Sequence, residues 1–387
     1  MTFLMAFNPF LIIISLFGSI LGIIWAALPG LSASMVMALL IGLTYKMNIE
    51  VVISFMLGVF TSTQFGGSIS AILINIPGTP SAIPTQLAGN QLAKRGQGGL
   101  AIGMALISSM IGNVVGLLAL AFLAPLIIQF ALKFSSWEIG LLALWGVAIS
   151  GTLTASDEMP IKGWISGWLG LIIAMVGRDT IFAVERLTFN NINLENGIPY
   201  VSVLIGLFGM TEIFSTLPSS QKTGVPAKVG KVFPPLKMVF KYWKSIIRSS
   251  VIGLITGIMP GAGGNVGSFV AYGVGERITK RRFTDGDFEG VVCSEVANNA
   301  NIGGALLPGL TLGIPGSAPV ASFMAALALH GVHSGPMIER SNPGILTFIY
   351  GTLFIANIWM VVMGFLLIKP SVNLFSLPIA TFFTLIG

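Results

Sequence analysis

A short polar run at residues 294–301, SEVANNAN, interrupts one of the most apolar parts of this chain. Glu295 and Asn299 are four residues apart, so on a helix they share one face, which Asn298 extends. An acid at membrane depth is costly unless it is paired or hydrated, which makes it a functional candidate by default. We therefore expect Glu295, Asn298 and Asn299 to form an ion-coupling site for a proton or a sodium ion. The alternative is a solvated acid at a helix start, because further acids occur at 287–289.

A second set of polar residues lies beside four Pro-Gly pairs, and none of its members is charged. Hydroxyl and amide groups can bind a carboxylate or coordinate a sodium ion without burying a fixed charge. The free N–H groups at the start of a half-helix also attract an anion. The alternative is that Ser and Thr only cap the helix starts. We expect these residues to bind a substrate, and they are Ser32, Asn75, Thr79, Ser81, Asn265, Ser268 and Ser317.

The Pro-Gly pairs occur at matching places in the two halves of the chain. They are Pro29-Gly30 and Pro77-Gly78 in the first half, and Pro260-Gly261 and Pro315-Gly316 in the second. The second-half pairs follow the first-half pairs by 231 and 238 residues, so the spacing is nearly preserved. Proline removes a backbone donor, and such pairs interrupt membrane helices. Interrupted segments at corresponding positions of two halves are a sequence indication of a transporter binding site.

The composition indicates what surrounds these residues. The chain is 54% hydrophobic and 9% charged, with a mean hydropathy of +0.90, whereas soluble domains carry about 25% charged residues. No charge occurs in the first 45 residues, between Glu50 and Lys94, or between Arg95 and Lys133, and such runs exceed the roughly 20 residues that cross a bilayer. A signal peptide is disfavoured because no basic segment precedes the first apolar stretch. We predict an all-α polytopic membrane protein with about ten to twelve membrane segments.

The four breaks divide the chain into two repeats, which we expect to be inverted and to contain broken helices or re-entrant hairpins. Residues 1–218 form the first transmembrane repeat, within which 179–199 is polar enough to be a lid or a surface segment. Residues 219–245 form a basic cytoplasmic linker with an interfacial helix. Residues 246–387 form the second repeat, which ends within an apolar stretch, so we expect a C-terminal truncation.

The basic residues predict the orientation. Seven of the 20 lie between Lys222 and Arg248, and no acid occurs between Glu212 and Glu276. Such a segment is typical of a cytoplasmic loop that contacts the anionic lipid of the bilayer. Nucleic-acid binding is disfavoured because membrane segments flank it. Lys94-Arg95 is expected on the same side, with 179–199 on the outer side.

Catalytic and metal-binding patterns are weak in this sequence. The single Cys293 excludes an internal disulfide, and His330 and His333 lack further metal ligands at suitable spacing. No nucleophile elbow or phosphate loop occurs. We expect no enzyme, no cofactor and no firm metal site. An intramembrane enzyme that uses Glu295, Cys293 or His330 and a channel remain as alternatives.

Several of these segments resemble the large membrane subunit of the tripartite tricarboxylate transporter family. They are residues 66–80, 260–263, 268–272, 295–299 and 311–317, and the resemblance extends over essentially the whole chain. It implies a multi-pass protein of the bacterial inner (cell) membrane that imports small carboxylates such as citrate by sodium or proton symport. It also implies two partners, namely a small membrane subunit and a periplasmic solute-binding protein that delivers the substrate.

Overall fold

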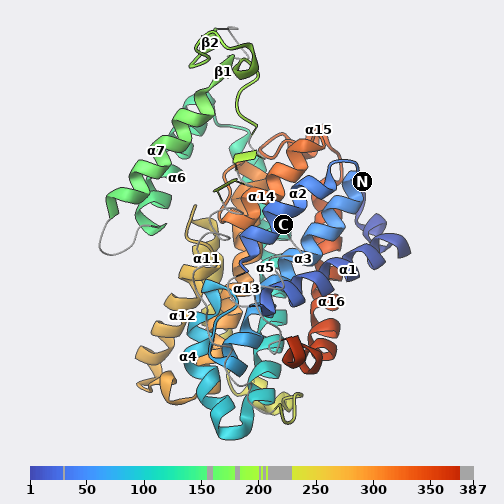
Figure 1. The fold of residues 1–387 in the computed structure, drawn as a ribbon, viewed down its shortest axis with the longest axis vertical. Helices are drawn as coiled ribbons and strands as arrows, with labels where there is room; N and C mark the ends of the chain where they lie inside the picture. Colours follow the sequence, from blue (N-terminus) through green and yellow to red (C-terminus); the bar gives the residue numbers. More distant parts are fainter. Residues whose placement is uncertain are drawn as a thin grey trace.

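The computed structural model describes residues 1–28, 31–154, 160–178, 184–199, 202–203, 206–207 and 229–374. Helices dominate this part of the chain (Figure 1). The elements up to residue 131 are η1 (Phe3–Phe7), α1 (Pro9–Ala27), α2 (Ala33–Thr44), α3 (Ile49–Ile74), η2 (Pro80–Ala82), α4 (Ile83–Leu92), η3 (Ala93–Gln97) and α5 (Gly98–Ala131).

The central elements are α6 (Ser136–Thr154), α7 (Pro160–Met175), β1 (Gly177–Arg178), β2 (Glu185–Arg186) and η4 (Ile192–Leu194). The remaining ones are α10 (Leu236–Phe240), α11 (Trp243–Ile258), α12 (Gly263–Thr279), η6 (Phe283–Asp285), α13 (Phe288–Leu312), α14 (Ala318–Leu329), α15 (Ile338–Ser341) and α16 (Ile345–Leu374). Within the described ranges, the short antiparallel pair β1–β2 is the only sheet.

Four helical stretches are long and apolar enough to cross a membrane: Pro9–Ala27, Ile49–Ile74, Pro80–Ala131 and Ile345–Ser371. Shorter apolar helices, such as Ala33–Thr44 and Ala318–Leu329, lie beside the breaks. The all-α polytopic fold predicted from composition is therefore confirmed. The number of membrane segments and the division into domains stay predictions.

Glycines bring α1 against α3, and α11 against α13, at corresponding positions. A β-carbon on Gly66 would lie 2.7 Å from the carbonyl oxygen of Ile23, and one on Gly304 would lie 2.7 Å from that of Leu254. Gly304 follows Gly66 by 238 residues, and Leu254 follows Ile23 by 231 residues. The same two offsets separate the Pro-Gly pairs of the two halves. Only glycine permits such close backbone approach.

The second break of each half also folds back in the same way. The Gly78 N–H donates to the carbonyl oxygen of Gly67 at 3.2 Å, and the Gly316 N–H donates to that of Ala305 at 3.4 Å. Each of these bonds returns the chain to the middle of the long helix that precedes it, α3 or α13. The break thereby sets the start of the next helical segment, η2–α4 or α14, beside that long helix.

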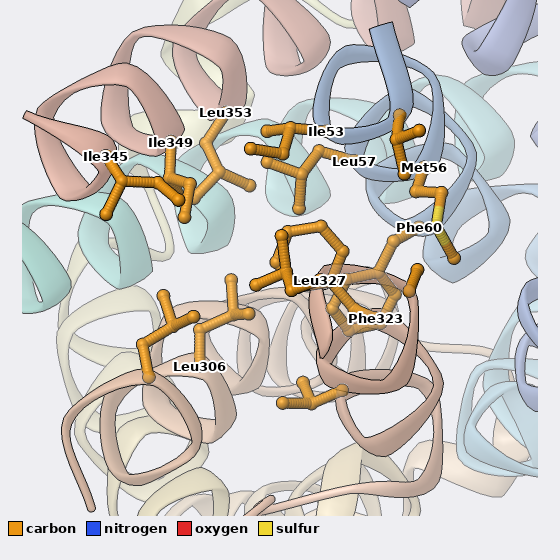
Figure 2. Close-up of a cluster of buried hydrophobic side chains, with 14 of the residues drawn as sticks. Ile53, Met56, Leu57, Phe60, Leu306, Phe323, Leu327, Ile345, Ile349 and Leu353 are labelled. Carbon is orange, nitrogen blue, oxygen red and sulfur yellow. The ribbon is translucent and has the colours of Figure 1, made fainter. Parts of the chain in front are cut away.

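The helices of the two halves interlock. α5 of the first half packs along α13 of the second, and α16 of the second half packs along α3 of the first. Figure 2 shows the resulting core, in which Leu57 of α3, Leu306 of α13, Phe323 of α14 and Leu353 of α16 gather around one centre. All four are buried, so this core depends on both halves at once.

Basic segments from both halves lie at one end of the molecule, the lower end in Figure 1. Arg95 donates to the carbonyl oxygens of Asp285 and Gly286, in the turn between α12 and α13. The start of α5 touches the segment before α10, where a β-carbon on Gly99 would lie 2.6 Å from the Lys231 carbonyl oxygen. β1 and β2 lie at the opposite end, beyond α7.

The predicted surface segment 179–199 is described from residue 184 onward. It contains β2 and η4, and Arg178 of β1 pairs with Glu185 at 3.1 Å and with Glu195 at 3.0 Å. These ion pairs are exposed, which agrees with a position outside the bilayer. The role of residues 179–199 as a lid stays a prediction.

The basic segment 219–245, in which we expected an interfacial helix, is described from residue 229 onward. Its helical part is α10 with the start of α11.

Candidate functional site

Residues at the helix breaks line a cavity of about 210 Å³. This volume is below the roughly 300–1,000 Å³ of pockets that hold drug-sized ligands, so it suits a small molecule. Its lining comes from both halves. The lining residues are Ser32, Ala33, Ser34, Gln64, Thr79, Pro80, Ser81, Gly261, Ala262, Gly263, Gly264, Asn265, Asn301, Ser317, Ala318 and Pro319.

Four helix starts meet at this cavity, those of α2, η2–α4, α12 and α14. The first N–H groups of a helix have no partner within it, and the helix dipole places partial positive charge there. None of the described lining residues is Lys, Arg, Asp or Glu. The arrangement therefore attracts an anion through backbone N–H groups and hydroxyls rather than through a fixed charge.

Side-chain capping, the alternative interpretation of these hydroxyls, applies to one of the three hydroxyl residues that stand at N-cap positions here. The Ser32 hydroxyl accepts from the Met35 N–H at 3.2 Å and caps α2. Thr79 and Ser317 stand at N-cap positions without a capping bond. The Thr79 hydroxyl instead faces that of Ser81 at 3.1 Å, and the buried Ser317 hydroxyl has no protein partner. Two helix starts therefore keep donors available for a ligand.

Five of the predicted substrate-binding residues line the cavity: Ser32, Thr79, Ser81, Asn265 and Ser317. Asn75 and Ser268 do not. Asn75 is an exposed residue that ends α3 in the left-handed conformation, at φ 59°, and its carbonyl oxygen accepts from Gln86 at 2.9 Å. The Ser268 hydroxyl donates to the Asn265 carbonyl oxygen at 2.9 Å, within its own helix.

Of the predicted breaks, Pro77-Gly78, Pro260-Gly261 and Pro315-Gly316 separate helices as expected. Pro29-Gly30 lies outside the described residues, between the end of α1 and the start of α2. The sequence reasoning did not select Gln64, which lines the cavity from within α3. Its signal was the polar run at 61–64, which precedes the paired glycines 66 and 67.

Glu295 lies in a sealed cage of hydroxyl groups. It has no exposed surface. Its Oε1 accepts from Ser68 of α3 and from Thr85 of α4, each at 2.5 Å, and its Oε2 accepts from Ser109 of α5 at 2.9 Å. Three O–H donors satisfy the carboxylate without a basic partner. The alternative of a solvated acid is wrong, and Glu289 is the acid at the start of α13.

The two predicted amides flank this cage on α13. The Asn298 amide nitrogen donates to the Gln64 carbonyl oxygen at 3.1 Å, and that of Asn299 donates to the Glu295 carbonyl oxygen at 2.9 Å. Both side-chain oxygens are buried without a protein donor. Buried acceptors that lack a donor are costly, so these two oxygens are available to a cation or to water.

The cavity and the cage share their supporting elements. Gln64 and Ser68 are four residues apart on α3, and Ser81 and Thr85 are four apart on the η2–α4 stretch. Asn301, which lines the cavity, follows Glu295 by six residues on α13. At 1.5 Å per residue these separations are roughly 6 and 9 Å. A ligand in the cavity therefore touches the same helices that hold the Glu295 carboxylate.

The other candidates have structural partners. The ring nitrogens of His330 face the carbonyl oxygens of Ala326, at 2.8 Å, and Thr44, at 3.1 Å, which holds the end of α14 against α2. His333 is exposed, and the described residues contain no group of three or more His, Cys, Asp or Glu side chains that could hold a metal ion. Cys293 is buried, and its sulfur lies 3.4 Å from Arg248 Nη2.

A polytopic helical membrane protein with an uncharged polar cavity at converging helix starts has the architecture of a transporter. The chain belongs to the tripartite tricarboxylate transporter TctA family, whose sequence model matches residues 12–387. Since this is a family of transporters, the chain is a transmembrane subunit of a tripartite transporter, and the enzymatic alternative is wrong.

Two curated proteins of Agrobacterium vitis are similar to this chain. One, described as an uncharacterized 52.8 kDa protein in the TAR-I ttuC' 3'region, is 32% identical over 387 residues, which covers 96% of this chain and 74% of the relative. The other, an uncharacterized protein in the TAR-II ttuC' 3'region, is 34% identical over 128 residues, which covers 33% of this chain and 53% of the relative. No solved structure matches.

Proposed function

We propose that this subunit imports a small di- or tricarboxylate across the bacterial inner membrane as a cation-coupled secondary transporter. The observation that carries the proposal is the cavity in which helix starts with uncapped donors converge. Carboxylate oxygens are the acceptors that such N–H and O–H groups favour. Membership of the tripartite tricarboxylate transporter TctA family supports a carboxylate as the substrate.

The substrate carboxylates lie at the helix starts, between hydroxyls of the two halves. Ser81 and Thr79 contact the substrate from the first half, and Asn265 and Ser317 from the second, with Ser32 beside them. The amides of Gln64 and Asn301 bind from the long helices. Asn75 and Ser268 lie outside this site, in the turn after α3 and in the first turns of α12, and do not contact the substrate.

Glu295 carries the coupling ion, and a proton fits its cage better than sodium. Hydroxyl groups of Ser68, Thr85 and Ser109 already donate to the Glu295 carboxylate, which has no charged side chain among its hydrogen-bond partners, so a proton can be taken up there without a further ligand. Sodium remains the second candidate, because the amide oxygens of Asn298 and Asn299 lack donors.

Alternating access would move the elements around the cavity against one another. The matched contacts of the two halves support two structural repeats, and an inverted relation between them is the arrangement that secondary transporters use. An elevator-like motion is one form of this transition. The partners are a small membrane subunit and a periplasmic binding protein, and the segment around β2 and η4 faces the side from which the substrate arrives.

Uptake by the complete transporter in proteoliposomes tests this proposal. The full subunit, its small membrane partner and its binding protein are reconstituted, and labelled citrate uptake is measured with no gradient, with a pH gradient and with a sodium gradient. A carrier gives saturable uptake that requires a gradient. Flux that does not saturate and follows the voltage alone supports the channel alternative, and the absence of uptake of any di- or tricarboxylate contradicts the importer.

A further inference from the structure

Exposed apolar side chains form a stripe along α10 and the start of α11. Leu236, Phe240, Trp243 and Ile247 recur at intervals of four, three and four residues, and between 54% and 70% of each is exposed. These intervals place them on one side of a helical segment. The stripe continues along α11 through three further exposed residues, namely Val251, Ile255 and Ile258.

A stripe of lysines runs beside this apolar stripe, one residue further along the chain. Lys237, Lys241 and Lys244 are all exposed. Lys241 Nζ lies 5.3 Å from the centre of the Tyr242 ring, and Lys244 Nζ lies 5.7 Å from that of the Trp243 ring. Both ammonium groups are therefore exposed and lie beside aromatic rings, as in residues that occupy a membrane interface.

The acids nearest to this surface already have partners. Asp287 pairs with Arg281 at 2.5 Å, and Glu289 pairs with Arg281 and lies 3.9 Å from Arg248. In the part of the chain that the structure describes, no acidic side chain pairs with the three lysines. Their positive charge is therefore available to an external anion.

The opposite face of the segment is fixed to the rest of the protein. Val239 and Tyr242 are buried against Met104 of α5 and against Val292 and Val296 of α13. The lysines and the apolar stripe are consequently held in place rather than carried on a mobile tail. The basic end of α11 lies at the same end of the molecule as Lys94-Arg95, and the apolar part leads from there toward the helix breaks (Figure 1).

We propose that α10 and the start of α11 form a binding site for one anionic phospholipid. Its phosphate lies between Lys241 and Lys244, and its acyl chains lie along the stripe from Ile247 to Ile258. A phospholipid is the ligand that matches both parts, since a phosphate alone would leave the apolar stripe uncovered. A transmembrane helix of a partner would cover the apolar stripe but would not need the lysines.

Lipid retention measured by native mass spectrometry tests this site. The whole chain is reconstituted in an equimolar mixture of phosphatidylglycerol and phosphatidylcholine, extracted in a nonionic detergent, and its bound lipids are identified. A Lys near an anionic membrane surface contributes about a fivefold factor in affinity. We expect the double variant K241Q/K244Q to lose about thirtyfold of the preference for phosphatidylglycerol.

The control removes two lysines from the opposite end of the molecule. Lys46 precedes α3 and Lys133 follows α5, and both are exposed, so K46Q/K133Q changes the net charge equally. This control variant should retain the preference for phosphatidylglycerol. The wild type should lose that preference only when about 1 M salt screens the lysines. Matching melting temperatures of the variants in detergent show that both are folded.

Three results would overturn the proposal. The first is equal retention of phosphatidylglycerol and phosphatidylcholine by the wild type. The second is an equal loss of preference in the control pair. The third is that K241Q/K244Q loses the small membrane subunit on co-expression while it keeps phosphatidylglycerol, which would make this face a protein interface.

Discussion

Replacement of Glu295 by glutamine tests the proposed coupling most directly. The variant keeps the shape of the side chain and an acceptor for Ser68 and Thr85, while its amide can donate to the Ser109 hydroxyl. Only the proton-binding carboxylate is removed. We expect substrate binding to persist, because Glu295 does not line the cavity, and we expect proton-driven accumulation to disappear.

The magnitude follows from the isolation of this group. α3, α4 and α5 contribute only hydroxyls to the cage. On two other helices packed on α13, Arg248 of α11 faces Glu289 and Cys293 rather than Glu295, and the buried Tyr272 hydroxyl of α12 has no hydrogen-bond partner. Under the proposed proton coupling, we therefore expect the cage to take up one proton per cycle. One proton contributes a factor of ten in accumulation, or about 1.4 kcal/mol, for each pH unit across the membrane.

The assay is steady-state accumulation of labelled citrate in proteoliposomes with the voltage clamped and the pH difference varied. The wild type should gain tenfold per pH unit, and E295Q should show no dependence on the pH gradient. Glu50→Gln is the matched control, because Glu50 lies in the first turn of α3, away from the cage, and it should keep the wild-type slope. An unchanged slope in E295Q would refute the reasoning.

Three further predictions concern the cavity and the helix crossings. Ser317→Ala should raise the KM for the carboxylate about 10- to 100-fold, because a hydrogen bond to a charged group contributes about 1.5–3 kcal/mol. Ser268→Ala is the control and should leave the KM unchanged, because the Ser268 hydroxyl bonds within its own helix. Thr79→Ala should have a similar effect on KM to Ser317→Ala, and equal uptake kinetics in both variants and wild type would contradict the proposed site. Gly66→Ala and Gly304→Ala should each destabilise the protein by about 1–3 kcal/mol, seen as a lower melting temperature in detergent. Gly42→Ala, which has open space around it, should not lower it.

The sequence predicted the helices and the breaks well, because both depend on local chemistry. Long uncharged runs indicate membrane helices, and proline with glycine ends them wherever they lie. Thr79 and Ser317 were selected because they follow the breaks directly. Asn75 was selected because it lies beside a break, two residues before Pro77, although it ends a helix in the left-handed conformation, a local role that Asn often takes.

The cage around Glu295 could not be predicted from the sequence. Ser68, Thr85 and Ser109 precede Glu295 by 227, 210 and 186 residues. They meet because α5 of the first half packs on α13 of the second, and no periodic pattern specifies which helices interlock. Serines and threonines within apolar helices also bond to their own backbone, so the residue type alone does not distinguish a cage from ordinary packing.

The absence of fixed charge among the described lining residues of the cavity has an electrical consequence. No arginine or lysine there neutralises the substrate, so the carboxylate keeps its full charge as it crosses. Moving each negative charge into a cell with a negative interior costs about 2.3 kcal/mol per 100 mV. One proton on Glu295 offsets one such charge. A fully ionised tricarboxylate that enters with one proton would therefore carry two net negative charges inward, and the charge moved per substrate molecule would give the number of cations that travel with it.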